Sequence, residues 1–163
     1  MVRWRRSDDL PPEAKAALGL ERRDRVLAAA RLVDGTWAAA TGTTLVLPGE
    51  RLDWVRVEHA EWSNDTETLV VDLVDDTRRR TLRLDAPGRL PETLRERVTA
   101  SIVASRRYPV QGRAGVRVVA RRRTKDDDLI WQVVADAGLD PEDERVRAVA
   151  DAGLAEMRRE LDA

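Results

Sequence analysis

The sequence predicts an α+β protein: a curled antiparallel meander of six strands, capped by a helix and followed by a β-hairpin and a C-terminal amphipathic helix. Three observations predict this fold class. Short apolar stretches with a period of two recur between residues 25 and 84, and turn residues separate them at fairly regular intervals. From residue 90 the apolar period becomes that of a helix. A second alternating region and a second helical region then complete the chain of 163 residues.

The strands of the meander are separated by residues that favour turns. Asp34-Gly35 is the strongest hairpin signal, because both residues tolerate a positive φ. Pro48-Gly49, Asn64-Asp65 and Asp75-Asp76 mark the later turns. The expected strands therefore cover residues 25–33, 36–41, 43–47, 52–62, 66–74 and 78–84.

The fourth strand, residues 52–62, is predicted to bend the sheet. The apolar residues just before His59 occupy odd-numbered positions, as at Val57, and those beyond it occupy even-numbered positions, as at Trp62. A slip of one residue exchanges the two faces of a strand. We therefore expect a β-bulge near residues 58–59, of the kind that turns the corner of a curled sheet.

A helix is expected after the meander, over residues 91–107. Pro91 suits the first turn, and Pro109 and Gly112 are expected to end the helix. The apolar stripe that should cover the sheet recurs every fourth residue, at Leu90, Leu94, Val98 and Ile102.

The rest of the chain is predicted to add a hairpin and a final helix. Alternation in residues 116–121 and 129–135 indicates the two strands of the hairpin. Asp140 is the expected N-cap of the helix, and Pro141 its first residue. Its apolar stripe comprises Val146, Val149, Ala150, Leu154, Met157 and Leu161.

The expected domain organisation is a lead-in followed by one globular domain. Residues 1–24 form a polar lead-in with a short helix that starts at Pro11-Pro12. Residues 25–163 form the domain, with the sheet and helix in 25–108 and the hairpin and last helix as an extension in 109–163.

Composition excludes several classes of site. The chain has no Cys, hence no disulfide, thiolate nucleophile or cysteine metal site, which suits a cytoplasmic protein. The N-terminal residues lack an apolar signal core, and no apolar run reaches the ~20 residues of a membrane span. We therefore expect no membrane association.

The charge is distributed unevenly along the chain. Residues 75–125 carry 15 basic and 5 acidic side chains, whereas residues 126–163 carry 4 and 12. These segments either neutralise each other or leave a basic patch for an anionic partner. Strand alternation separates the arginines between two faces, which favours neutralisation by residues 126–128 or 142–144. The candidate anionic-partner surface comprises Arg106, Arg107, Arg117, Arg121, Arg122 and Arg123.

Motifs for catalysis and for cofactors are missing. The sequence has no Gly-x-Ser-x-Gly elbow and no glycine-rich phosphate loop, so we expect no catalytic residue and no cofactor. His59 is the only histidine and is interpreted as a structural residue of the bulge. The three aspartates at residues 126–128 are interpreted as a solvated turn. We therefore expect no metal site. Trp4 lies among arginines and is a candidate for docking on a partner or on a second copy.

Four segments of the chain resemble a family of uncharacterised actinobacterial proteins: residues 54–62, 95–103, 115–120 and 138–141. That family carries no activity that could be transferred. The order of six strands and a helix also resembles the pleckstrin-homology (PH) superfold, a PH-like partial barrel of two nearly orthogonal sheets closed by a helix. Members that bind phosphoinositides use a long basic first loop, whereas the turn here is Asp34-Gly35, so the resemblance does not imply lipid binding.

The sequence therefore favours an uncharacterised, non-catalytic binding or scaffold module of the cytoplasm that interacts with another protein. One alternative is a nucleic-acid-binding protein that uses the arginine-rich segment 106–123. A second is a small enzyme with a site built from carboxylates alone. Association with a second copy of the chain stays open.

Overall fold

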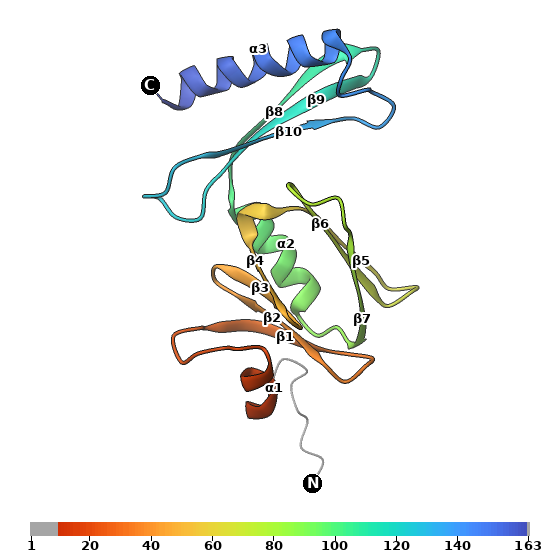
Figure 1. The fold of residues 1–163 in the computed structure, drawn as a ribbon, viewed down its shortest axis with the longest axis vertical. Coiled ribbons are helices and arrows are strands. Elements are labelled where there is room, and N and C mark those ends of the chain that lie inside the picture. The colour runs from red at the N-terminus through yellow and green to blue at the C-terminus, as the bar shows by residue number, and fades with distance from the viewer. Residues whose placement is uncertain (1–9, 163) are drawn as a thin grey trace. The chain divides into compact units, whose positions relative to one another are not determined.

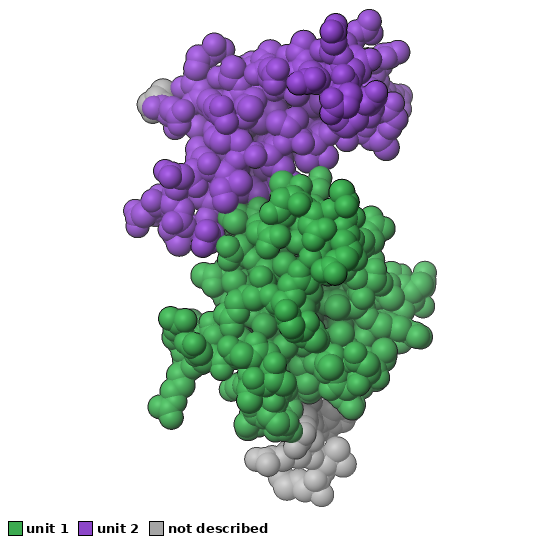
Figure 2. Space-filling model, viewed as in Figure 1, with its two compact units in different colours: residues 1–101 green, residues 102–163 purple. Residues whose placement is uncertain are grey.

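The computed structural model describes residues 10–162, and the chain divides into two compact units, Met1–Ser101 and Ile102–Ala163 (Figure 2). In the described residues, the first unit contains a seven-stranded antiparallel sheet and the second a three-stranded one. The predicted α+β class is confirmed (Figure 1). That residues 25–163 act as one domain stays a prediction.

The first unit is a meander whose two ends pair with each other. The strands are β1 (Val26–Leu32), β2 (Trp37–Thr41), β3 (Thr44–Leu47), β4 (Glu50–Asp53), β5 (Val57–Ser63), β6 (Thr68–Leu73) and β7 (Arg80–Ala86). Their order in the sheet is β4-β3-β2-β1-β7-β6-β5. Pairing of β1 with β7 curls the sheet and leaves β4 and β5 as its two edges.

The expectation of a single fourth strand was wrong, because a 3₁₀ turn at Trp54–Arg56 divides it into β4 and β5. Trp54 anchors this turn: its indole N–H donates to the carbonyl of Thr41 at 2.9 Å, and its backbone N–H donates to Thr43 at 3.3 Å. The predicted irregularity is confirmed, since the register of β5 with β6 shifts between Val57 and His59. The meander therefore has seven strands where six were expected.

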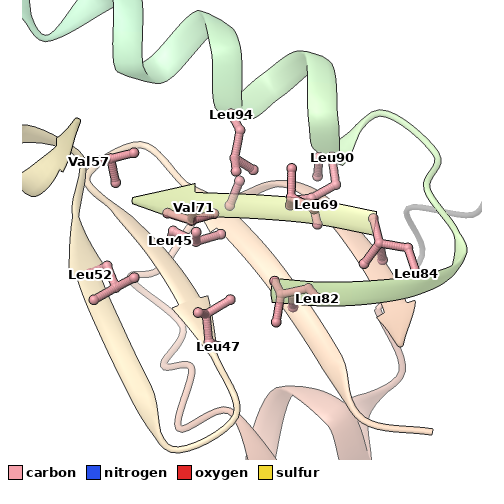
Figure 3. Close-up of a cluster of buried hydrophobic side chains, with 14 of the residues drawn as sticks. Leu45, Leu47, Leu52, Val57, Leu69, Val71, Leu82, Leu84, Leu90 and Leu94 are labelled. Atoms are coloured by element: carbon pink, nitrogen blue, oxygen red, sulfur yellow. The ribbon is translucent and has the colours of Figure 1, made fainter. Parts of the chain in front are cut away.

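Helix α2 (Leu90–Ala100) lies in the curve of the sheet and closes its core (Figures 1 and 3). Leu90 and Leu94 are 0% exposed, and each stabilises the fold by about 1.5–3 kcal/mol through burial. The sheet residues around them include Leu45, Leu52, Val57, Leu69, Val71 and Leu84.

Helix α1 (Pro12–Ala17) packs against the other face of the first strands. Ala14 contacts a small second cluster that contains Ala29 of β1 and Ala39 of β2, which pair across the two strands. Their alanine neighbours on β1 and β2 point to the main core. Successive strand residues face opposite sides, so these alanine-rich strands are buried on both faces. The predicted short N-terminal helix is confirmed.

The predicted helix 91–107 was wrong beyond Ala100. Ser101 ends the helix, with its hydroxyl donating to the carbonyl of Val98 at 2.7 Å. The β-branched pair Ile102-Val103 then begins β8 (Ile102–Gln111), where such residues are favoured. Pro109, expected to stop a helix, is instead accommodated in a strand, because β8 is an edge strand.

The second unit is a three-stranded meander with one covering helix. Strands β8, β9 (Ala114–Arg121) and β10 (Ile130–Ala135) lie in the order β10-β9-β8. The predicted hairpin is the β9–β10 pair, and β8 is the strand that the sequence reading missed. Helix α3 (Glu144–Leu161) contacts all three strands and buries Val146 and Met157.

The predicted start of the last helix was wrong by three residues. The N-cap is Asp143, whose side chain accepts the backbone N–H of Arg145 at 2.8 Å. Asp140 instead accepts the N–H of Glu142, in the turn before the helix. Asp140 and Asp143 offer the same capping chemistry, so sequence alone did not distinguish them.

Within the described residues, no helix is long and apolar enough to cross a membrane.

An ion-pair network joins β7 to the edge strand β4. Arg80 is 9% exposed and bonds Glu50 through Nη2–Oε1 at 2.5 Å and Nε–Oε2 at 3.2 Å. It also contacts Asp76 at 2.9 Å. The hydrogen bond from Arg80 lowers the pKa of Glu50. Removing one member of such a pair leaves the other charge without compensation.

We predict that Arg80→Met lowers the Tm by about 5–10 °C, because it leaves Glu50 and Asp76 without their shared cation. Arg79→Met is the matched control: Arg79 is 63% exposed and pairs with Asp72, so its loss should change the Tm by about 2 °C or less. Thermal denaturation of both variants checks the difference. Equal shifts would contradict a structural role for Arg80.

A close contact also fixes α3 on its sheet. A Cβ added at Gly153 would lie 2.6–3.0 Å from ring atoms of Tyr108, and the Tyr108 hydroxyl donates to the Gly153 carbonyl at 3.3 Å. Gly→Ala in a helix normally stabilises by about 1 kcal/mol. Glycine is therefore present here for packing.

We predict that Gly153→Ala destabilises the protein by about 1–3 kcal/mol, because overpacking outweighs helix propensity. Urea denaturation of the single variant, of Tyr108→Leu and of the double variant measures the coupling. Combined with Tyr108→Leu, the alanine should become favourable. A stabilising Gly153→Ala in the wild-type background would show that the contact does not constrain α3.

Candidate functional site

Two of the six candidate arginines are engaged in ion pairs within the second unit. Arg106 on β8 reaches across to α3, where it pairs with Glu156 at 2.7 Å and with Glu160 at 2.9 Å. Arg107 bonds the carboxylate of Asp136. Arg106 and Arg107 are thus neutralised by Glu156, Glu160 and Asp136, and not by residues 126–128 or 142–144, which were the expected partners.

The six candidates do not form one surface. Arg117 is exposed on β9, where it lies opposite Arg107 of β8 and shares the face of Arg107, whereas Arg106 lies on the other face. Arg121 is buried and donates to the side chain of Gln132 at 3.0 Å. Arg122 donates to the backbone carbonyl of Lys125, and Arg123 is exposed. The six residues therefore lie on different faces and in different environments.

The charge asymmetry along the sequence disappears when the charges are counted by unit. Residues 102–163 carry 12 basic and 12 acidic side chains, and residues 1–101 carry 17 and 18. The segment 75–125 crosses the division after Ser101. Its excess of arginine is balanced, in each unit, by acidic residues elsewhere in the sequence.

Asp136, which directly follows β10, links this strand to β9 and β8 through its side chain. It accepts the backbone N–H of Gly115 at 2.8 Å and bonds Arg107, and these contacts lower the pKa of Asp136, the Gly115 bond most. A Cβ at Gly115 would lie 2.4 Å from the carbonyl oxygen of Tyr108, so only glycine fits this approach.

An acidic depression lies beside β5 and β6. It is lined by Glu58, His59, Asp72, Leu73, Val74, Asp75, Asp76 and Thr77. Asp72, Asp75 and Asp76 are paired with Arg79, Arg56 and Arg80, respectively. The hydrogen bond from Arg56 lowers the pKa of Asp75, and chiefly the backbone N–H of Arg78 lowers the pKa of Asp76.

Asp75 and Asp76 are therefore poorly suited to donating a proton, which requires a raised pKa. His59 is exposed, and its Nε2 lies 3.6 Å from the carboxylate of Glu61. Among residues 10–162, no group of three histidine or acidic side chains is placed to hold a metal ion.

An apolar groove of about 550 Å³ lies between α1 and the β1–β2 turn, in the first unit. Its lining is mostly apolar, with Glu13 and Arg31 as the charged members. The lining residues are Pro11, Glu13, Ala14, Ala17, Leu18, Arg31, Gly35, Thr36, Trp37 and Pro48. Volume and composition match those of ligand grooves in proteins.

Trp37 is the aromatic residue of this groove and is half-buried. Trp54 and Trp62, by contrast, donate their indole N–H groups to Thr41 and Asn64. The indole N–H of Trp37 has no acceptor within the described part of the chain. A buried tryptophan N–H usually finds a hydrogen-bond acceptor. The groove therefore offers a ligand an apolar surface and one hydrogen-bond donor.

Sequence reasoning missed the groove. It assigned Trp37 to the core with Trp54, Trp62 and Trp131, although Trp54 alone of these four is fully buried. A usable signal was the pair Pro11-Pro12 at the start of α1, which indicates a short helix before the first strands. Trp4, the other candidate docking residue, lies outside the described residues.

Comparison with known protein families, with curated proteins and with solved structures finds no match to this chain. The resemblance to actinobacterial proteins therefore stays a prediction.

We predict that Asp136→Asn lowers the Tm at pH 7 by on the order of 3 °C, and that this effect shrinks as the pH falls below the ordinary pKa range of an aspartate. The folded-state pKa of Asp136 is depressed, so its contribution is present above the unfolded pKa and is lost as the pH falls through the folded value. Asp128→Asn is the control, since no side-chain ion pair of Asp128 occurs in the described residues. A pH-independent effect of Asp136→Asn would contradict the charged interaction.

Proposed function

We propose that the protein is a non-catalytic binding module of the cytoplasm, and that its binding site is the groove between α1 and the β1–β2 turn. The observation that carries the proposal is this apolar groove with the indole N–H of Trp37, which has no acceptor among residues 10–162. The occupant is an extended, apolar segment of a protein partner. Its carbonyl oxygen accepts the Trp37 hydrogen bond, and its side chains fill the space between the helix and the strand.

A peptide suits the groove better than a polar small molecule. Pro11, Pro48 and Trp37 offer flat apolar surface, the kind that binds proline-containing extended peptides in other recognition modules. The groove contains few polar groups, so it lacks the convergent donors and acceptors that orient a polar ligand. Glu13 and Arg31, of opposite sign, give the occupant a preferred direction.

A PH-like classification of the first unit is part of the proposal. It is supported by seven antiparallel strands in the order β4-β3-β2-β1-β7-β6-β5 and by a helix that follows the last strand. The short Asp34-Gly35 turn favours a protein ligand over a phosphoinositide head group, because it supplies no basic loop. Absence of cysteine supports the cytoplasmic assignment.

Nucleic-acid binding receives less support. A nucleic-acid surface needs several cations on one exposed face. Here Arg106 and Arg107 are paired with carboxylates, and Arg121 is buried. The carboxylate-only enzyme receives less support for a similar reason, since the aspartates beside β5 and β6 are paired with arginines.

We predict that random 12-residue peptides selected on the full chain will bind in this groove, and that Ala17→Arg will weaken their binding at least tenfold. Ala17 lines the groove and is exposed, so arginine there blocks the site without disturbing the core. Ala16→Arg is the matched control, an exposed neighbour on the same helix that does not line the groove. Isothermal titration calorimetry measures the affinity of the selected peptides for each variant.

Trp37→Phe tests the hydrogen bond separately, because phenylalanine keeps an aromatic surface and removes the donor. We expect a loss of about threefold to tenfold in affinity, typical of one net hydrogen bond. Selection of no peptide, or equal binding by the wild type and Ala17→Arg, would reject the groove as the binding site. Binding of apolar small molecules without peptides would reject the protein partner.

A further inference from the structure

We propose that two copies of the chain associate through β10, by antiparallel pairing of this strand with itself about a twofold axis. The pairing joins two three-stranded sheets into one of six strands. It uses the second unit only, so it is independent of the groove on the first unit.

Three of the four strand edges carry features that prevent pairing with another chain. β4 has four residues, three of them charged. β5 is irregular at Val57–His59 and carries Glu58 and Glu61. β8 contains two adjacent arginines, a proline and two register irregularities. Charge, proline, shortness and bulges are the usual means of protecting an edge.

β10 has none of these protections. Its six residues, Ile-Trp-Gln-Val-Val-Ala, carry no charge and no proline, and its register with β9 is regular. Ile130 is 41% exposed and Val133 is 43% exposed. The two residues have opposite parity and lie on opposite faces of the sheet. In the described chain, no strand pairs with the outer side of β10. An apolar edge of this kind is expected to pair with another strand.

The backbone shows which groups are available. The N–H of Asp136 donates to the carbonyl of Gly115 on β9 at 3.0 Å, so the even-numbered residues bond inward. By alternation, the N–H and C=O groups of Trp131, Val133 and Ala135 point to the outer edge. An antiparallel pair centred on Val133 places Trp131 opposite Ala135 of the second copy, and Val133 opposite its own equivalent. All three outward residues then form hydrogen-bonded pairs.

A second copy fits this edge better than a foreign strand. β10 has no charge that would select an oppositely charged partner. Pairing with itself brings the exposed Val133 side chains together and keeps apolar residues opposite apolar ones on that face. The second unit has 12 basic and 12 acidic residues, so two copies do not repel through net charge.

Helix α3 leaves room for this contact. It is tied to β8 by the ion pairs of Arg106 and by the contact between Tyr108 and Gly153. Val133, on the same face at the other edge of the sheet, remains exposed. A six-residue edge is smaller than a standard interface, so we expect a Kd on the order of 1–100 µM.

Sedimentation velocity of the full chain between about 1 µM and 1 mM tests the proposal, with a concentration-dependent monomer–dimer equilibrium expected. Val133→Lys should weaken dimerisation at least tenfold, because it places two like charges opposite each other. Val33→Lys is the control: Val33 is also an exposed valine, and its substitution should leave the dimer unchanged. Circular dichroism confirms that both variants fold.

A cysteine cross-link tests the register. The chain has no cysteine, so Val133→Cys carries one thiol per copy. Opposed hydrogen-bonded residues have Cα atoms about 5.5 Å apart, within the range for a disulfide. Val133→Cys should form a covalent dimer under mild oxidation, and Ser105→Cys on β8 should form it at least tenfold more slowly.

Three outcomes would overturn the proposal. They are a wild-type chain that stays monomeric up to about 1 mM, a Val133→Lys variant that dimerises as the wild type does, and cross-linking of Val133→Cys no faster than that of Ser105→Cys. The first would also show that β10 remains an unpaired edge in solution.

Discussion

The first unit depends on the burial of α2 in the curve of its sheet. The chain has no phenylalanine and a single tyrosine, so leucine, valine and alanine fill most of its core. Leu90 and Leu94 are completely buried by residues from both ends of the meander. Small side chains fill space only when the elements approach closely. The alanines of β1 and β2 permit that approach, and the pairing of β1 with β7 holds the sheet around the helix.

The same small side chains account for the groove. Ala29 and Ala39 bring α1 close to the outer face of β1 and β2, with Ala14 against them. Six residues of helix cannot cover the end of β2, where the much larger Trp37 lies half-buried. A short helix beside a large aromatic ring therefore leaves an apolar recess. The binding site proposed here is thus a direct consequence of an alanine-rich sheet covered by a short helix.

Local patterns predicted most of the fold, and they were wrong where a tertiary interaction decided the outcome. The change of parity at His59 revealed the irregular strand, because alternation is a local property. Ile102 kept the four-residue spacing of α2 although it begins β8, since pairing with β9 outweighs the helical pattern. The partners of Arg106, 50 and 54 residues away, could not be read from nearby charges. Nor could the groove, which exists only between folded elements.

Electrostatics limits what either unit can recognise. In sequence, the arginines of residues 75–125 suggest an anionic partner, but each unit is nearly neutral, and arginines such as Arg80, Arg106 and Arg107 are paired with carboxylates of their own unit. A nearly neutral surface with paired charges attracts a polyanion only weakly. Selective contacts must then come from apolar shape and from backbone hydrogen bonds. The described residues offer such contacts at two places that share no helix or strand. One is the groove beside Trp37, where the indole N–H has no acceptor among these residues. The other is the uncharged outer edge of β10, which pairs with no other strand in the described chain.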